Sequence, residues 1–171
     1  MEAWAAITAR RNVRTFTDRV IGREDLDRIL EAARRTPSSR NSQPWDFVVV
    51  TDRASLVELA KVWQGSGHVA GSAPTVGVVM AASSDPKHRE SVAFDLGQAV
   101  MQMMIAAADM GIGSAHGWVV DQDQARKVLA LPADKELAWV VSLGYPADHP
   151  LRPIRKLNRR PFDEVVHREM W

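Results

Sequence analysis

The spacing of apolar positions along the chain predicts helices that alternate with short buried strands. Residues 23–35 place apolar side chains every three or four positions and acidic residues in the first turn, where the helix dipole favours them. Short apolar runs bounded by turn residues are typical of buried strands. The expected helices are 1–9, 23–35, 52–63, 87–110 and a short one between Asp121 and Pro132. The expected strands are 47–50, 74–81, 112–118 and 137–143.

The longest expected helix, 87–110, is apolar on nearly every side beyond Phe94, which predicts a central and buried position. Gly111 is expected to cap its C-terminal end. Three small residues would let another helix approach closely: Ala93, Gly97 and Ala99. Four methionines are interpreted as core filler: Met101, Met103, Met104 and Met110.

The chain shows no repeat, no low-complexity tract and no Gly/Ser linker, so we expect one domain over residues 1–171. Alternating helices and few strands favour an α+β or α/β fold with one sheet covered by helices. The tail from Asp148 is polar, yet it carries aromatic and β-branched residues. We therefore expect it to dock on another surface rather than to be disordered.

Composition excludes several classes of function. The absence of cysteine excludes disulfides, a thiolate nucleophile and iron–sulfur or Cys-ligated zinc sites. The five histidines lack metal-binding spacing, and aromatic and basic residues are not interleaved, so we expect no metal and no nucleic acid. With no signal peptide and no long apolar run, we expect a soluble, cytoplasmic protein without a membrane partner.

Charge is distributed unevenly along the chain, although the formal net charge is only +1. Basic residues gather in 1–14 and 151–171, and the stretch between them is acidic. The two basic ends either meet an anion or pair with that acidic body, and charge alone does not decide between these alternatives.

Three segments are candidates for ligand binding. Residues 10–14 hold three arginines, which suits a phosphate or a solvated basic turn. Residues 37–45 (PSSRNSQPW) offer hydroxyl, amide and guanidinium groups between two prolines, as a binding loop or an ordinary capped loop. The glycines of 111–117 would allow close approach to a flat ligand, or form a cap and a turn. They follow a helix, which is the reverse of a dinucleotide-binding fingerprint.

Taken together, these segments resemble the FMN-dependent nitroreductase family along almost the whole chain. Residues 10–16 (RRNVRTF) are similar to the family's RRSxRxF segment, and 37–45 are similar to its PSxxNxQPW loop. Residues 95–114 resemble its long dimer-core helix and Gly-rich exit. The closing strand and tail of the family are matched by 143–146 (LGYP) and 159–166 (RRPFDEVV).

The resemblance implies a nitroreductase-like α+β fold with a central mixed or antiparallel sheet flanked by helices. It also implies a homodimer with shared FMN sites and a C-terminal tail that crosses to the partner subunit. Four arginines would neutralise the FMN phosphate: Arg10, Arg11, Arg14 and Arg159. Four residues, from the partner subunit, would line the isoalloxazine ring and ribityl chain: Ser38, Ser39, Asn41 and Gln43. His116, Gly117 and Trp118 would lie near the reactive face, and Gln64 at the pyrimidine edge.

Three features depart from the family pattern. Asn12 replaces the usual Ser and keeps a short hydrogen-bonding side chain within the implied cofactor site. Leu157 stands where many members carry a second cationic phosphate ligand, a charge that Lys156 or Arg160 would then supply. The brief segment from Met80 to Pro86 leaves no room for the extra lid helices of many relatives, which implies a more open site.

The implied function is hydride transfer from NAD(P)H through FMN to a nitroaromatic, quinone or similar acceptor by a ping-pong mechanism. The cofactor would carry the chemistry, so no dedicated catalytic acid or base is expected. The alternatives are a protein that binds or sequesters FMN without turnover, a cofactor-free dimerisation module, and the same fold with a deazaflavin or performing reductive dehalogenation or dehydrogenation.

Overall fold

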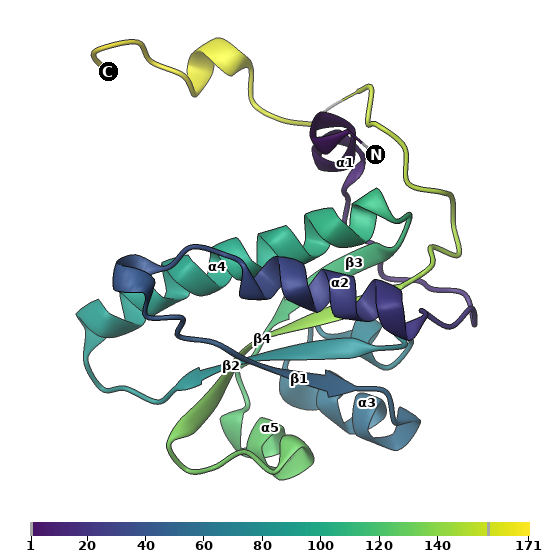
Figure 1. The fold of residues 1–171 in the computed structure, drawn as a ribbon, viewed down its shortest axis with the longest axis vertical. Coiled ribbons are helices and arrows are strands. Elements are labelled where there is room, and N and C mark those ends of the chain that lie inside the picture. Colours follow the sequence, from purple (N-terminus) through teal and green to yellow (C-terminus); the bar gives the residue numbers. More distant parts are fainter. Residues whose placement is uncertain (1, 157) are drawn as a thin grey trace.

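The computed structural model describes residues 2–156 and 158–171, so the expectation about Leu157 lies outside the described residues. Its centre is a four-stranded sheet in the order β1-β2-β4-β3, antiparallel at every pairing (Figure 1). The strands are β1 (Asp46–Val50), β2 (Thr75–Ala81), β3 (Gly113–Trp118) and β4 (Lys135–Gly144). The expected α+β class is confirmed, and of the two sheet types the antiparallel one is present.

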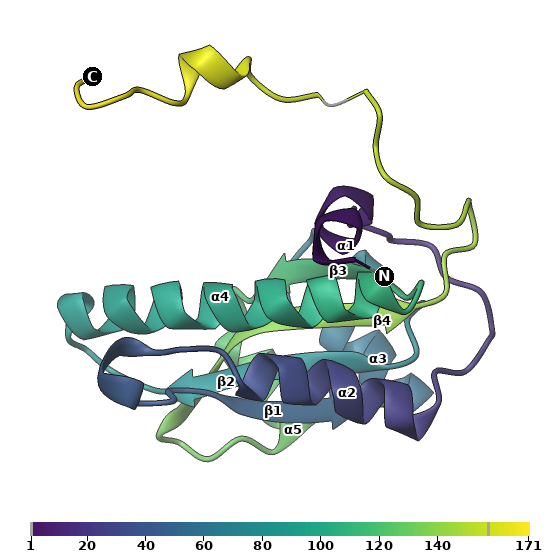
Figure 2. The ribbon, with the colours of Figure 1, turned by 45° about the horizontal axis from the view of Figure 1, so that its top comes forward.

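Helices cover both faces of the sheet, so the chain has three layers (Figures 1 and 2). Helices α2 (Arg23–Arg34) and α4 (Pro86–Asp109) pack on one face, and α3 (Arg53–Leu59) and α5 (Gln122–Leu129) pack on the other. Helix α1 (Ala3–Ala9) contacts α4. Fully buried side chains such as Met103 and Leu143 pack between the sheet and helices α2 and α4. Leu56 and Leu137 pack between the sheet and helices α3 and α5.

The helix ends follow the sequence closely. Asp52, Asp85 and Asp121 each accept a backbone N–H of the first turn, which satisfies a donor that the helix leaves free. Gly111 lies just past α4 at φ +72°, and the Ile112 N–H reaches the carbonyl of Ala107, so the expected glycine stop is confirmed.

Two expected helices differ from the structure. The helix predicted over 52–63 ends at Leu59 and continues as a 3-10 turn over Ala60–Val62. Trp63 is extended, and its ring lies close beside Gly65. The short helix after Asp121, α5, begins with only half of a capping box. Gln124 donates its N–H to Asp121, but its side chain binds Glu58 instead of returning to the cap.

Helix α4 is not buried on every side, contrary to the prediction. Leu96, Ala99 and Met103 are fully buried, whereas Phe94 is 71% exposed and Met101 is 40% exposed. Length and composition alone would let α4 cross a membrane, but half of its apolar window is buried inside the protein, as in a core helix. Its second apolar face remains open to solvent in the described chain.

The C-terminal tail leaves the sheet after β4, passes α1 and then extends away from the body (Figure 2). The Ile154 N–H donates to the carbonyl of Thr8 at 3.0 Å, which fixes the tail beside α1. Beyond this point the described part of the tail contains a 3-10 turn, Phe162–Glu164, and the side chains of Phe162, Val165, Val166, Met170 and Trp171 are exposed. The expectation that they dock on another surface stays a prediction.

Candidate functional site

The segment after α1 extends the edge of the sheet. The Val13 N–H donates to the carbonyl of Ser114 at 2.9 Å, and Asn12 pairs with Ser114 in a parallel bridge. Gly113 makes this approach possible, because a Cβ at that position would lie 2.7 Å from a Val13 methyl group. The basic segment therefore runs along β3, whose exposed side chains include His116.

Four cationic or titratable side chains gather along this edge, and we call them the cationic edge: Arg10, Arg14, His116 and Arg159. Partial burial and the charge of Arg159 lower the pKa of Arg10. Partial burial and the charges of Arg10 and Arg14 lower the pKa of His116, so the imidazole is neutral at physiological pH. The Arg10 guanidinium donates to Asn12 Oδ1 at 3.1 Å.

Within the described chain, neither Arg10 nor Arg14 forms an ion pair with a carboxylate. The charge distribution left two alternatives open, binding of an anion or pairing with the acidic body. At Arg10 and Arg14 the described residues show no pairing with the acidic body. Guanidinium groups that repel one another and lack an acidic partner form a site for an anion.

An aromatic-walled cavity adjoins the cationic edge. The rings of His116 and Trp139 meet edge to face with centroids 5.7 Å apart. Trp139 and Trp118 line a cavity of about 550 Å³ between β3, β4 and α4. Cations beside an apolar, aromatic cavity fit a molecule that has an anionic end and a flat ring.

Arg11 lies apart from this cluster. Its guanidinium donates to Asp148 Oδ1 at 2.7 Å and to the carbonyl of His149 at 2.8 Å. Arg160, expected as a compensating charge, lies 3.5 Å from Glu164 in the tail. Neither described contact joins these two arginines to Arg10, and their proposed contact with a phosphate stays a prediction.

The loop that carries Gln64 packs beneath β3. A Cβ at Gly117 would lie 2.6 Å from Ser66 Oγ and 3.6 Å from His68 Nε2, so only glycine lets this loop approach the strand. Gln64 is exposed and precedes Ser66 by two positions on this loop. The Ser66 hydroxyl donates to the carbonyl of Trp118, the last residue of β3, so the loop lies next to the end of that strand. The structure thus brings Gln64 to the same edge as Gly117.

Sequence reasoning missed His68, which is 7% exposed and lies at the base of this edge. Its Nδ1 is 2.7 Å from Ser142 Oγ. The Ser72 hydroxyl donates to the carbonyl of Val69, so it accepts from Thr75 at 2.6 Å. Thr75 accepts in turn from Ser142 at 3.3 Å. Each hydroxyl has one proton, so His68 must donate from Nδ1.

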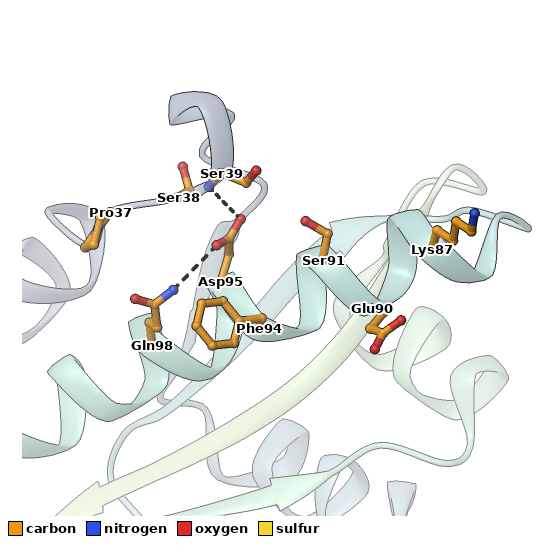
Figure 3. A pocket seen from close by; sticks show the side chains of 9 residues that line it. All are labelled: Pro37, Ser38, Ser39, Lys87, Glu90, Ser91, Phe94, Asp95 and Gln98. Carbon is orange, nitrogen blue, oxygen red and sulfur yellow. Dashed lines mark hydrogen bonds between the residues drawn. The ribbon is translucent and has the colours of Figure 1, made fainter. Parts of the chain in front are cut away.

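The other predicted ligand residues lie in residues 38–43, which we call the serine loop. The Ser39 N–H donates to Asp95 Oδ2 at 3.1 Å, and Gln98 donates to Oδ1 at 3.5 Å (Figure 3). The Gln43 N–H donates to Ser38 Oγ at 2.9 Å. Asp95 is 3% exposed on α4, so a buried carboxylate holds the loop against the helix.

The backbone of the serine loop is strained. Three of its residues adopt positive φ without being glycine: Arg40 at 53°, Asn41 at 55° and Gln43 at 48°. Such conformations are uncommon and gather at ligand-binding segments. Beside the loop, a groove of about 650 Å³ runs along α4 and is lined by Phe94, Lys87 and Glu90 (Figure 3).

The cationic edge and the serine loop lie on opposite sides of α4. The loop follows α2 and contacts α4 from that side, whereas β3 is the sheet edge farthest from β1. None of the contacts described above joins the two groups. The structure therefore assembles the predicted site residues as two separate halves.

The family of this chain is assigned by comparisons with known proteins. The model of the nitroreductase family matches residues 7–66 and 61–145. An Archaeoglobus fulgidus protein assigned as an NADH dehydrogenase/NAD(P)H nitroreductase is 33% identical over 178 residues, covering 99% of both chains. The chain belongs to the nitroreductase family and is an oxidoreductase of that family.

Two further proteins are similar to this chain. An FMN-dependent nitroreductase from Clostridium difficile has the same fold, with a TM-score of 0.84, 21% identity and coverage of 97% of this chain and 98% of that one. An iodotyrosine deiodinase from Thermotoga neapolitana is 27% identical over 163 residues, 81% of this chain and 86% of the relative.

We predict that His68 makes stability depend on pH. Burial, with the charges of Arg14 and His116, lowers the pKa of His68 from 6.5 to about 4. Between these pH values the unfolded chain binds a proton at His68 and the folded chain does not. The contribution of neutral His68 to the free energy of unfolding is therefore complete above pH 6.5 and is lost as the pH falls to about 4. The loss is about 3 kcal/mol.

Urea unfolding at several pH values measures this effect. His68→Asn keeps a donor for Ser142 and removes the titration, so its stability should fall less than that of the wild type below pH 6.5. His167→Asn, in the exposed tail, serves as the control and should follow the wild type. Equal pH dependence in all three proteins would show that His68 does not couple folding to pH.

Proposed function

We propose that the protein is an FMN-dependent oxidoreductase that transfers hydride from NAD(P)H to a nitroaromatic, quinone or similar acceptor. The observation that carries this proposal is the cationic edge, whose Arg10 and Arg14 form no ion pair among the described residues, beside an aromatic cavity in a nitroreductase-family chain. An FMN phosphate suits the first feature and an isoalloxazine ring the second. The FMN-dependent relative supports the choice of cofactor.

The proposed roles of the site residues follow from their two locations. Arg10, Arg14 and Arg159 neutralise the phosphate, because the positive charges of this edge need a counter-charge. Trp118 and the backbone of His116 and Gly117 lie along the ring. Gln64 reaches the pyrimidine edge of the same cofactor from the loop beneath β3. Four serine-loop residues complete the site from a second copy of the chain: Ser38, Ser39, Asn41 and Gln43.

A homodimer is proposed because one chain holds the two halves on opposite sides of α4. The open face of α4 is apolar, with Phe94 and Met101 exposed, and nothing lies within 4 Å of a Cβ at Gly97. A second helix can therefore approach closely at this point. The exposed tail, with Phe162 and Trp171, would find its docking surface on the same partner.

When bound, FMN supplies the redox chemistry, by taking up hydride from NAD(P)H and passing it to the acceptor. The chain positions the cofactor and the substrates. His116 is neutral at physiological pH, so it places a polar ring at the edge without adding to the charge of the three arginines. No dedicated acid or base is assigned. Because both substrates would use one open site in turn, we propose a ping-pong mechanism. We also propose that the protein acts in the cytoplasm.

A second candidate reaction is reductive dehalogenation by the same bound cofactor. The observation that favours it is the similarity to the iodotyrosine deiodinase, which extends over 81% of this chain. The two candidates share the cofactor site and differ in the acceptor. Turnover with a nitroaromatic, a quinone or a halogenated phenol separates them.

We predict that the purified protein loaded with FMN loses its yellow absorbance when it is mixed with NADH or NADPH without oxygen. Addition of an acceptor should restore the colour. Initial rates at several concentrations of both substrates should give parallel double-reciprocal lines. Persistent oxidised absorbance with both nicotinamides would instead identify a protein that stores FMN without turnover.

We predict that Arg10→Ala together with Arg14→Ala weakens FMN binding by about 2–4 kcal/mol, since each charge-assisted contact contributes about 1.5–3 kcal/mol and the two are not additive. Quenching of FMN fluorescence measures the affinity. The matched control is Arg34→Ala with Arg35→Ala, which removes two arginines that pair with Glu31 on α2. An equal loss in both variants would refute the phosphate assignment.

A further inference from the structure

The base of the C-terminal tail is fixed to the segment that carries the cationic edge. The Thr17 N–H donates to the carbonyl of Tyr145 at 2.9 Å, and the Ala147 N–H donates to the carbonyl of Thr15 at 3.0 Å. Phe16 and Pro146 form an antiparallel bridge between them. The tail therefore begins as a short partner of the residues that follow Arg14.

Arg11 then closes this junction. One of its terminal nitrogens lies 2.7 Å from Asp148 Oδ1 and 2.8 Å from the carbonyl of His149. The His149 N–H donates to the same carboxylate oxygen at 2.7 Å. Hydrogen bonds from Arg11 and from this N–H lower the pKa of Asp148 to about 2, so the pair stays charged throughout the physiological range.

The Arg11 side chain is only 19% exposed, compared with 44% for Asp148, so this ion pair is partly shielded from solvent. Arg11 is adjacent in sequence to Arg10, but its hydrogen bonds point to the tail. The Asn12 side chain instead accepts from Arg10. Two neighbouring arginines of the basic segment thus serve different partners.

Downstream, the tail brings a cation back to the edge. Arg159 lies further along the tail, and its charge, with partial burial, lowers the pKa of Arg10, so the two guanidinium groups are electrostatic neighbours. Like charges do not attract each other. The described contacts that hold the tail against the body lie closer to its base, at the Arg11–Asp148 pair and the Ile154–Thr8 hydrogen bond.

We propose that the Arg11–Asp148 pair is a clamp that directs the tail so that Arg159 stands beside Arg10 at the proposed phosphate site. Arg11 is then a positioning residue that acts through Asp148, and not itself a phosphate ligand. This inference rests on the proposed FMN site. By this inference Asp148 contributes to the affinity for FMN, although no sequence pattern pointed to this residue.

The test is a double-mutant cycle read by FMN fluorescence. Asp148→Asn and Arg159→Ala should each raise the dissociation constant about tenfold, and the combined variant should be no weaker than Arg159→Ala alone. Asp46→Asn is the control, since it removes a carboxylate paired with Lys135 at 2.6 Å away from the edge. It should bind FMN as the wild type does.

A charge swap distinguishes the clamp from a local structural defect. Arg11→Asp should weaken FMN binding, and Arg11→Asp with Asp148→Arg should restore it to within about threefold of the wild type. Additive losses in the cycle, or no rescue by the swap, would overturn the clamp while leaving the FMN site intact. A wild-type protein that binds no FMN would instead overturn the proposed function and the clamp together.

Discussion

Helix α4 is the constraint on which the rest of the structure depends. One of its faces closes the core over the sheet, with Leu96, Ala99 and Met103 fully buried. The opposite face is also apolar, but in the described chain it remains open around Phe94 and Met101. Burial of such surface contributes roughly 25 cal/mol per Å², so the open face favours association with another surface. The same helix separates the serine loop from the cationic edge, and both facts lead to the proposed dimer.

Electrostatics at the sheet edge complement this arrangement. Arg10 and Arg14 lie close enough to His116 to lower its pKa, and Arg159 acts on Arg10 in the same way. Such repulsion costs stability in the absence of an anion. A bound phosphate would offset that cost, so cofactor binding and the order of this edge should be linked. The buried His68 and its hydroxyl network support the edge from below without adding charge.

The sequence was sufficient to predict the elements whose cause is local. The glycine after α4 and the apolar strands depend on neighbours in the chain, and the structure contains them. Contacts between distant residues left no such signal. His68 meets Ser142 from 74 positions away, and Arg11 meets Asp148 from 137 positions away. Periodicity likewise revealed that α4 is apolar, but not that one of its faces is left uncovered.

The candidate site shows the same division between local and distant causes. Motif resemblance pointed to the arginines and the serine loop as candidate ligands, and in the structure Arg10, Arg14 and His116 lie together along β3. It did not reveal that Asp95 anchors the loop, because this carboxylate acts on a backbone N–H 56 positions away. Nor did it reveal that the guanidinium of Arg11 donates to Asp148 and to the carbonyl of His149 in the tail.

Subunit complementation tests most directly the claim that two chains build each site. One variant carries Arg10→Ala and Arg14→Ala, and the other carries Ser38→Ala and Asn41→Ala. Co-expression with different tags allows the mixed dimer to be isolated. The account predicts that each variant alone binds little FMN, whereas the mixed dimer binds one FMN per two chains with wild-type affinity. A mixed dimer that binds no FMN would show that each site lies within one chain and would contradict the account.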